Sequence, residues 1–153
     1  MKKVAILFIV LLTSSFVFAQ NTYVPDDKFE QALIDLGYDT TLDDSVLTAN
    51  ISGVTVLDVS SKSISDLTGI EAFTSLIDLS CAFNQLTSLD VSRNTALTQL
   101  HCNNNQLTYL NMRNGVKEQL SNFNAKGNPS LTCIETLDPS YATANWTSAN
   151  GNI

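Results

Sequence analysis

Residues 76–89 read LIDLSCAFNQLTSL, and residues 97–110 read LTQLHCNNNQLTYL. The second stretch repeats the first after 21 residues, and the residues that recur include Leu79/Leu100, Cys81/Cys102, Asn84/Asn105, Gln85/Gln106, Leu86/Leu107, Thr87/Thr108 and Leu89/Leu110. A fixed period of roughly 20–50 residues is the signature of a fold built from stacked repeats. The sequence therefore predicts a series of similar coils that share one core.

Two further stretches extend the series. Coils begin at Val54, Leu76, Leu97 and Leu120, so the spacings are 22, 21 and 23 residues. Each fits the pattern L-x-x-L-x-L-x-x-N-x-L with some tolerance, the coil at Leu120 only loosely: apolar residues occupy positions 1, 4, 6 and 11, and asparagine position 9. In the first coil Lys62 replaces the asparagine, and we expect that coil to turn differently.

The pattern has a direct physical reading. Alternation of apolar and polar residues over positions 3 to 7 is the period of a half-buried strand. An asparagine after the strand can hydrogen-bond the main chain where the coil turns away. Positions 4 and 6 should therefore face the core, as Leu57/Val59, Leu79/Cys81, Leu100/Cys102 and Phe123/Ala125.

These residues resemble the leucine-rich repeat family, most strongly over residues 76–112. The flanking segments also resemble those of short secreted leucine-rich repeat proteins of Bacteroidota-type bacteria, in which cysteine is common at position 6. The resemblance implies a binding or surface-display role, an N-terminal cap and no catalytic residues. Such relatives usually continue beyond the last residues here, NWTSANGNI, to a further cysteine, so we expect the chain to be truncated.

The predicted fold is α/β, a short leucine-rich-repeat solenoid of about four coils. It has a parallel β-sheet on the concave face and an N-terminal helical cap. The predicted division of the chain is a signal peptide at residues 1–19, the cap at 20–53, the repeats at 54–131 and a C-terminal flank at 132–153.

One helix is expected within residues 24–37. Asp27 can cap its first turn, and Glu30 three residues later completes a capping box. Phe29, Leu33 and Leu36 fall on one face of this helix and should pack against Leu57.

The first 20 residues have the pattern of an export signal. Lys2 and Lys3 precede an apolar run from Val4 to Leu12, and Ala19 supplies a small residue before the expected cleavage point. The run is shorter than the ~20 residues that a membrane-spanning helix needs. We expect an exported protein, located outside the cell, on its outer surface or in the periplasm, with no membrane insertion after cleavage.

The charge of the remaining chain excludes some partners. Without residues 1–19 the chain has six basic and 15 acidic residues, so its net charge is near −9. Binding to nucleic acid needs a basic patch, which this chain lacks. We expect a monomer whose partner is a protein or a glycan.

The cysteines and the histidine of the repeats could have a chemical role, but a simpler structural role explains each of them. Cys81 and Cys102 could form a disulfide or bind a soft metal, but two small buried hydrophobic residues are expected at these positions. His101, the only histidine, points outward and has no nucleophile and carboxylate arranged with it as a triad. We therefore predict no catalytic residues.

An acidic cluster in the cap could indicate calcium, but its spacing does not fit an EF-hand loop. We predict no metal site and no cofactor, with these carboxylates serving as helix caps and solvated loop residues: Asp26, Asp27, Glu30, Asp35, Asp39, Asp43 and Asp44.

The predicted function is a non-catalytic binding module that recognises a protein or glycan through its concave sheet. A spacer segment of a longer surface protein is the alternative, and a hydrolase is third. The predicted ligand-binding residues are polar or aromatic and point outward: Asp58, Asp78, Ser80, Phe83, Gln99, His101, Asn103, Asn104, Asn122 and Asn124.

Overall fold

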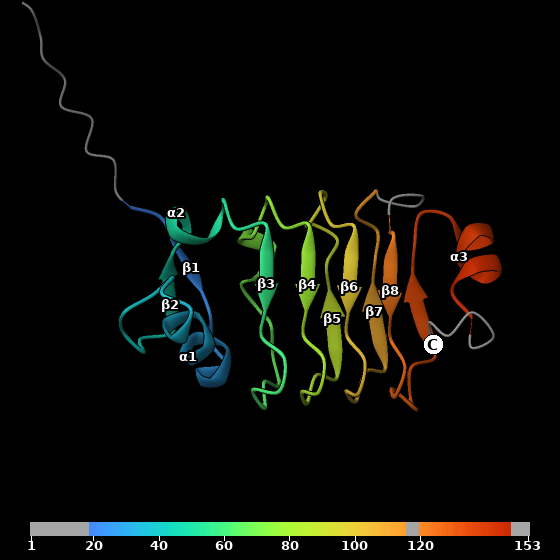
Figure 1. The fold of residues 1–153 in the computed structure, drawn as a ribbon, viewed down its shortest axis with the longest axis horizontal. Helices are drawn as coiled ribbons and strands as arrows, with labels where there is room; N and C mark the ends of the chain where they lie inside the picture. Colours follow the sequence, from blue (N-terminus) through green and yellow to red (C-terminus); the bar gives the residue numbers. More distant parts are fainter. Residues whose placement is uncertain (1–18, 116–119, 148–153) are drawn as a thin grey trace, which may run out of the picture.

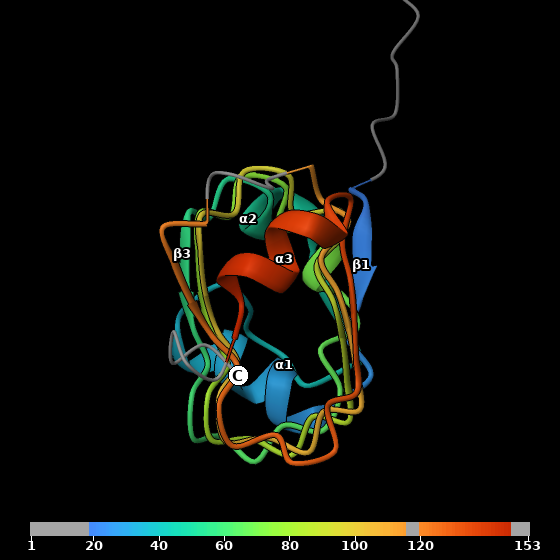
Figure 2. The same ribbon diagram turned by 90° about the vertical axis from the view of Figure 1, so that its right-hand side faces the viewer.

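The computed structural model describes residues 19–115 and 120–147, and it shows a row of coils with the cap at one end and helix α3 at the other (Figure 1). Viewed along the row, successive coils superpose on one flattened outline (Figure 2). The predicted solenoid architecture is confirmed. The predicted signal peptide, residues 1–19, lies outside the described residues except for Ala19.

The front sheet contains four parallel strands, in the order β3 (Val56–Asp58), β4 (Asp78–Ser80), β6 (Gln99–His101) and β8 (Asn122–Asn124). The register pairs Leu57 with Leu79, Leu79 with Leu100, and Leu100 with Phe123. All eight residues that the repeat pattern placed inside are buried. The register predicted from the alternation of apolar and polar residues is therefore confirmed.

A second parallel sheet forms the back of the solenoid. It contains β5 (Ser88–Asp90), β7 (Tyr109–Asn111) and β9 (Cys133–Glu135). The sequence predicted only that the chain returns along the back of each coil, and it did not predict a sheet there. The apolar residues of these back segments lie in short, separate runs. Leu89 and Leu110 are buried between the two sheets, and each is flanked by residues that point outward.

Buried asparagines at position 9 hold neighbouring coils together. The amide nitrogen of Asn105 donates to the carbonyls of Cys102, in its own coil, and Cys81, in the coil before (3.1 and 3.0 Å). Its oxygen accepts from the Leu86 main-chain nitrogen (3.0 Å). Asn84 and Asn128 make the same kind of bridge. A buried amide satisfied on both sides rigidifies the stack.

The first coil needs no asparagine of its own to close its turn. The main-chain nitrogens of Lys62 and Ile64 donate to the side-chain oxygen of Asn84 from the next coil (3.1 and 3.0 Å). The Lys62 ammonium instead reaches Asp35 at the end of the cap helix (3.1 Å). After this turn the chain forms the 3₁₀ helix η1 (Ile70–Ala72) on the way to β4.

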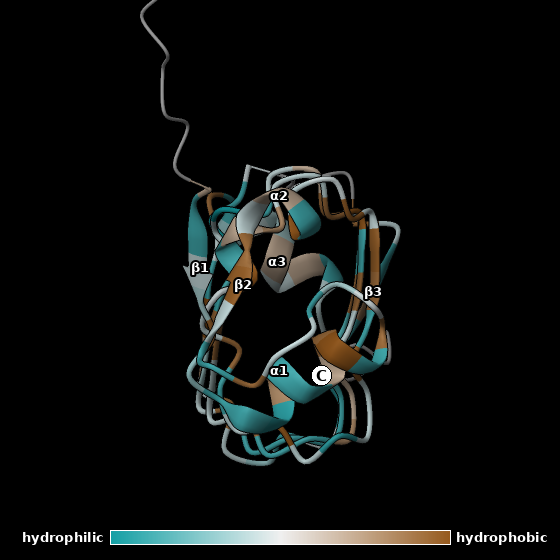
Figure 3. Cartoon of the chain, turned by 90° about the vertical axis from the view of Figure 1, so that its left-hand side faces the viewer, coloured by the Kyte–Doolittle hydropathy of each residue, from teal (hydrophilic) through white to brown (hydrophobic). Residues whose placement is uncertain are grey.

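The cap contains more than the expected helix α1 (Asp27–Asp35). Strands β1 (Asn21–Tyr23) and β2 (Ser45–Leu47) pair antiparallel, and the short helix α2 (Thr48–Ile51) follows. Figure 3 shows hydrophobic colouring on β2, whose Val46 is buried. Phe29 and Leu33 join the core that contains Leu57, as predicted, and the rings of Phe29 and Phe73 lie 6.4 Å apart.

Three details of the helix prediction are wrong. The N-cap is Asp26, whose carboxylate accepts from the Lys28 and Phe29 nitrogens (2.9 and 3.0 Å). Glu30 forms no capping box, because its buried carboxylate accepts from the main-chain nitrogens of Asp43, Asp44 and Ser45, where the loop leads into β2. Leu36 is 45% exposed, since the helix ends at Asp35 and the left-handed Gly37 reverses the chain.

The described C-terminal flank closes the far end of the core. Helix α3 (Pro139–Asn145) begins after Asp138, which caps it, and is followed by Trp146. Trp146 is 6% exposed, and the centroid of its indole ring lies 5.0 Å from that of the Phe123 ring. Within the described ranges, every helix is too short or too polar to span a bilayer.

Candidate functional site

The outward side chains of the front sheet form two ordered rows. The strand register aligns Val56, Asp78, Gln99 and Asn122 in one row, and Asp58, Ser80, His101 and Asn124 in the next. Because parallel strands lie ~4.8 Å apart, each side chain is beside its equivalent from the next coil. The structure thus brings most of the predicted binding residues onto one surface.

A third row follows where the strands end. The hydroxyls of Ser60 and Ser80 lie within 2.7 Å of each other, and Asn103 is half-buried. Ala82, one coil before Asn103 in the repeat, is only 6% exposed. We call the ten predicted binding residues together the front face.

The front face carries amides that the fold does not use. Within residues 19–115 and 120–147, the side-chain amides of Gln99, Asn103 and Asn122 make no hydrogen bond. The buried asparagines of position 9, in contrast, are bonded to two coils each. The unused donors and acceptors are therefore available to a partner.

Position 8 of every coil has a left-handed backbone. The φ angles are 58° at Ser61, 56° at Phe83, 55° at Asn104 and 70° at Gly127. Glycine and, to a lesser degree, asparagine tolerate this conformation, whereas a bulky residue there is an outlier. Phe83 is also 59% exposed. The sequence located Phe83 on the front face, but the strain at this position is visible only in the structure.

The row that contains His101 does not form a catalytic triad. Ser80 lies between Asp58 and His101 in register, so the serine and not the histidine is central. A triad needs the histidine between nucleophile and carboxylate. The hydroxyl of Ser80 is instead within hydrogen-bonding distance of Ser60, and one oxygen of Asp58 accepts from the Ser60 nitrogen (3.0 Å).

The two repeat cysteines lie in the core as predicted. Both are fully buried and free. Burial raises the pKa of the Cys102 thiol to about 12. Burial, together with the neighbouring Cys102, also raises the pKa of the Cys81 thiol well above its ordinary value. Neutral, enclosed thiols are poor nucleophiles and metal ligands. Cys133 on β9 is exposed.

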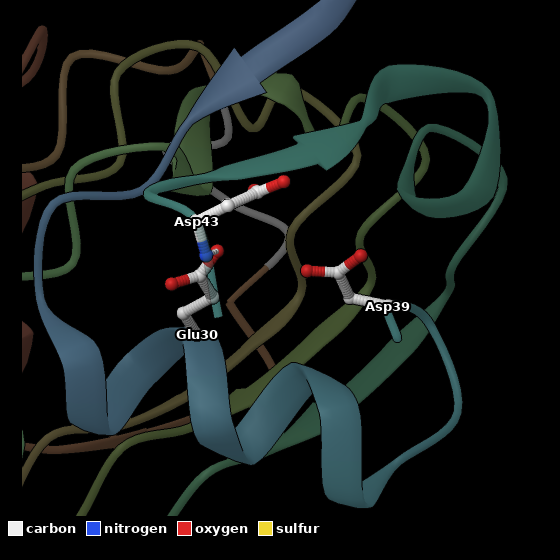
Figure 4. Close-up of side chains that lie close together, drawn as sticks. All are labelled: Glu30, Asp39 and Asp43. Carbon is white, nitrogen blue, oxygen red and sulfur yellow. Dashed lines mark hydrogen bonds between the residues drawn. The ribbon is translucent and has the colours of Figure 1, made fainter. Parts of the chain in front are cut away.

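The acidic residues of the cap include one close group. Carboxylate oxygens of Glu30, Asp39 and Asp43 lie within 4.8 Å of one another (Figure 4). Such oxygens suit Ca²⁺, which takes 6–8 ligands. The Glu30 carboxylate already accepts three main-chain N–H groups, from Asp43, Asp44 and Ser45, so its charge has a structural role. Among the residues that the structure describes, none forms a hydrogen bond with the buried Oδ2 of Asp39.

The comparisons with known proteins agree with this fold. No protein-family model matches the chain. Internalin J of Listeria monocytogenes is 36% identical over 75 residues, which are 49% of this chain and 8% of that protein. A solved structure described as the functional domain of InlJ, which includes a cysteine ladder, is 31% identical with a TM-score of 0.62. It covers 80% of this chain, and the match spans 27% of that chain.

A second solved structure, the internalin InlF of Listeria monocytogenes, has a TM-score of 0.59 over 80% of this chain and 35% of its own. At 20% identity it supports the fold alone. The chain therefore spans about a third or less of each of these proteins. The repeat pattern, the solenoid and these similarities agree on one class of protein.

Proposed function

We propose that this chain, a leucine-rich-repeat protein, is an exported interaction module that binds a protein partner through its front face and performs no catalysis. The observation that carries the proposal is the exposed, left-handed Phe83. A non-glycine residue held in this conformation costs roughly 1–3 kcal/mol, and such strain clusters at functional sites. An aromatic side chain retained there is best explained as an anchor for a partner.

The surroundings of Phe83 support a protein partner. The front face offers amides, two carboxylates and few positive charges, which disfavours nucleic acid. A polar rim around one aromatic anchor is the usual composition of a protein interface. The asparagine bridges between coils fix the spacing of the rows, so binding would need little reorganisation of the sheet.

The test uses affinity capture with the mature chain from residue 20 as bait, on surface proteins of its environment. Phe83→Asn and the pair Gln99→Ala/Asn103→Ala should each reduce recovery of a specific partner. Leu42→Ala is the matched control, because Leu42 is exposed to a similar degree (51% against 59% for Phe83) but lies in the cap. Equal recovery with all of these baits would refute binding through the front face.

Export is part of the same proposal and is tested separately. The basic, apolar and small residues of segment 1–19 predict cleavage before Gln20. Mass spectrometry of the protein from its native host should find Gln20 as the first residue. An intact Met1 on secreted material would contradict export by this signal.

A spacer role in a longer surface protein is the second candidate. It is favoured by one observation, that the chain matches only 8% of Internalin J and 27% of the solved InlJ chain. A spacer should tolerate the front-face variants without any change in surface display or adhesion of the whole protein. Loss of adhesion with those variants would decide for the binding module.

A further inference from the structure

The back sheet has a free edge at strand β5. This strand pairs only with β7, and it is the strand of the back sheet nearest the cap (Figure 1). The first coil supplies no strand beside it, because the returning chain of that coil forms the 3₁₀ helix η1 instead. A strand edge without a neighbour presents main-chain groups that can pair with another chain.

The main-chain groups of Ser88 and Asp90 face this free edge. Alternate residues of a parallel strand bond to opposite sides, and the Val91 nitrogen donates to the Asn111 carbonyl on the β7 side (3.0 Å). Leu89 therefore belongs to the ladder with β7, while Ser88 and Asp90 point toward the first coil. Within residues 19–115 and 120–147, their N–H and C=O groups have no partner on that side. Two donors and two acceptors are therefore available at this edge.

The first two coils are joined on either side of this edge and stay open between. Before it, the Gln85 nitrogen donates to the Ile64 carbonyl (2.8 Å). After it, the side-chain amide of Asn94 donates to the carbonyls of Ile70 and Phe73 (2.9 and 3.1 Å). The hollow between these bridges has a volume of about 140 Å³. Because the bridges hold the coils apart without a ligand, binding would need little rearrangement.

Exposed carboxylates from both coils line the hollow. Asp66 and Glu71 belong to the first coil, and Asp90 lies on β5. Asp66 and Glu71 each use one oxygen to accept hydrogen bonds within their own turn. Their second oxygens accept none from the described residues. One cation, Arg93, lines the adjoining hollow with Glu71 and Asp90, so the charge along the edge remains negative.

This charge limits what can pair with the edge. A second copy of the chain would bring the same carboxylates and a net charge near −9 without residues 1–19. Pairing between copies is therefore opposed, as charged edges oppose it in other sheets. A lysine or arginine side chain would instead meet carboxylate oxygens that the fold leaves unused, and charge-assisted hydrogen bonds are the stronger kind.

We propose that the free edge of β5 binds an extended, basic segment of a partner protein. The main chain of the segment pairs with Ser88 and Asp90, and one lysine or arginine side chain enters the hollow between Asp66, Glu71 and Asp90. Strand addition of this kind takes its affinity from main-chain hydrogen bonds and its specificity from side-chain pockets. The site is separate from the front face, because β5 belongs to the other sheet.

The experiment titrates the mature chain with a fluorescent hexapeptide in which lysine alternates with threonine and valine. Fluorescence anisotropy at about 0.15 M salt, where distant charges are screened, gives the affinity, and the ¹H–¹⁵N signals of Ser88 and Asp90 give the location. A glutamate version of the peptide reverses its charge. A version methylated on all main-chain nitrogens keeps the charge and cannot donate to a strand edge.

We expect saturable binding of the lysine peptide and much weaker binding of the other two. Asp66→Asn/Glu71→Gln keeps the acceptors of the turn and removes two charges, and it should weaken binding roughly three- to tenfold. Asp58→Asn/Asp78→Asn is the matched control, because it removes the same charge from the front face and should leave binding unchanged.

Ser88→Pro tests the main-chain pairing. It removes a donor from the free edge and leaves the ladder with β7 intact, and proline is tolerated on an edge strand where its nitrogen faces solvent. Binding of the lysine peptide should weaken roughly tenfold. If Ser88→Pro unfolds, the methylated peptide tests the pairing alone.

Several outcomes would overturn the proposal. These are no saturable binding of the lysine peptide, equal binding of the glutamate or methylated peptide, and normal binding by folded Asp66→Asn/Glu71→Gln or Ser88→Pro. Equal weakening by Asp58→Asn/Asp78→Asn would show that binding follows total charge. Weakening by Phe83→Asn would locate the peptide on the front face. Failure here leaves the front-face proposal untouched, since that proposal depends on Phe83.

Discussion

The carboxylate of Asp26 accepts two hydrogen bonds from Ser65, one from the main-chain nitrogen (2.8 Å) and one from the hydroxyl (2.7 Å). The same oxygen accepts from the Asp66 nitrogen, while the other oxygen caps helix α1. One side chain therefore joins the cap to the first coil across 39 residues of sequence.

Replacing Asp26 should loosen this junction. Asp26→Ala removes an N-cap, which alone is worth about 0.5–2 kcal/mol, and also leaves the Ser65 and Asp66 nitrogens without their acceptor. We expect a loss of ~1–3 kcal/mol in the free energy of unfolding, measured with a chemical denaturant. Asp27→Ala, one residue later and exposed, should change it by ~0.5 kcal/mol or less. Equal effects of the two would show that the junction does not stabilise the fold.

The same junction should weaken in acid. Burial raises the pKa of the Asp26 carboxyl, but hydrogen bonds from Ser65, Phe29 and Asp66 outweigh it and hold the pKa below its ordinary value of 3.8. Because the folded-state pKa is the lower one, the contribution is fully present above pH 3.8 and is lost as the pH falls through the folded-state value. The stability difference between the wild type and Asp26→Asn should shrink below about pH 4. A difference that stays constant with pH would contradict the bridge.

Leucines of the front strands should be the most sensitive positions. Leu79 and Leu100 are fully buried and pair in register across neighbouring coils. Truncation of either to alanine should cost ~2–5 kcal/mol, comparable with the whole stability of a small domain. Thermal unfolding followed by circular dichroism would measure it, with Leu42→Ala as an exposed control. A melting temperature within a degree or two of the wild type would be incompatible with their place in the core.

Phe83 should destabilise the folded state. Asparagine tolerates the left-handed conformation better, and Asn104 already occupies the equivalent position one coil later. Phe83→Asn should therefore raise the free energy of unfolding by about 0.5–1 kcal/mol. The reverse change, Asn104→Phe, should lower it by a similar amount. Destabilisation by Phe83→Asn would mean that the ring packs on the fold and is not free to serve as an anchor.

The three thiols should differ in reactivity. Cys133 is exposed, whereas Cys81 and Cys102 are enclosed and have raised pKa values. A thiol reagent at neutral pH should label Cys133 first, and the other two only after denaturant is added, because the thiolate is the reactive form. Mass spectrometry of labelled peptides separates the sites. Rapid labelling of all three in the native protein would mean that the coils open readily.

The sequence by itself determined the repeat, the strand register and the direction of each front-strand side chain. These follow from local rules, since alternation along a strand fixes which residues face the core and a 21-residue period fixes which residues become neighbours. Leu79 and Leu100 and the outward row of Asp58, Ser80 and His101 were predictable for this reason.

Only the tertiary structure decided features that depend on residues far apart in the chain. Asp26 is the N-cap, and its second carboxylate oxygen also accepts hydrogen bonds from Ser65. Glu30 does not cap the helix, because its carboxylate accepts three main-chain N–H groups around Asp43. Trp146 acquired its place by packing on Phe123, a contact that no repeat pattern encodes. The strain at Phe83 is visible only where the coil turns, because backbone angles there are set by the stacking of all four coils.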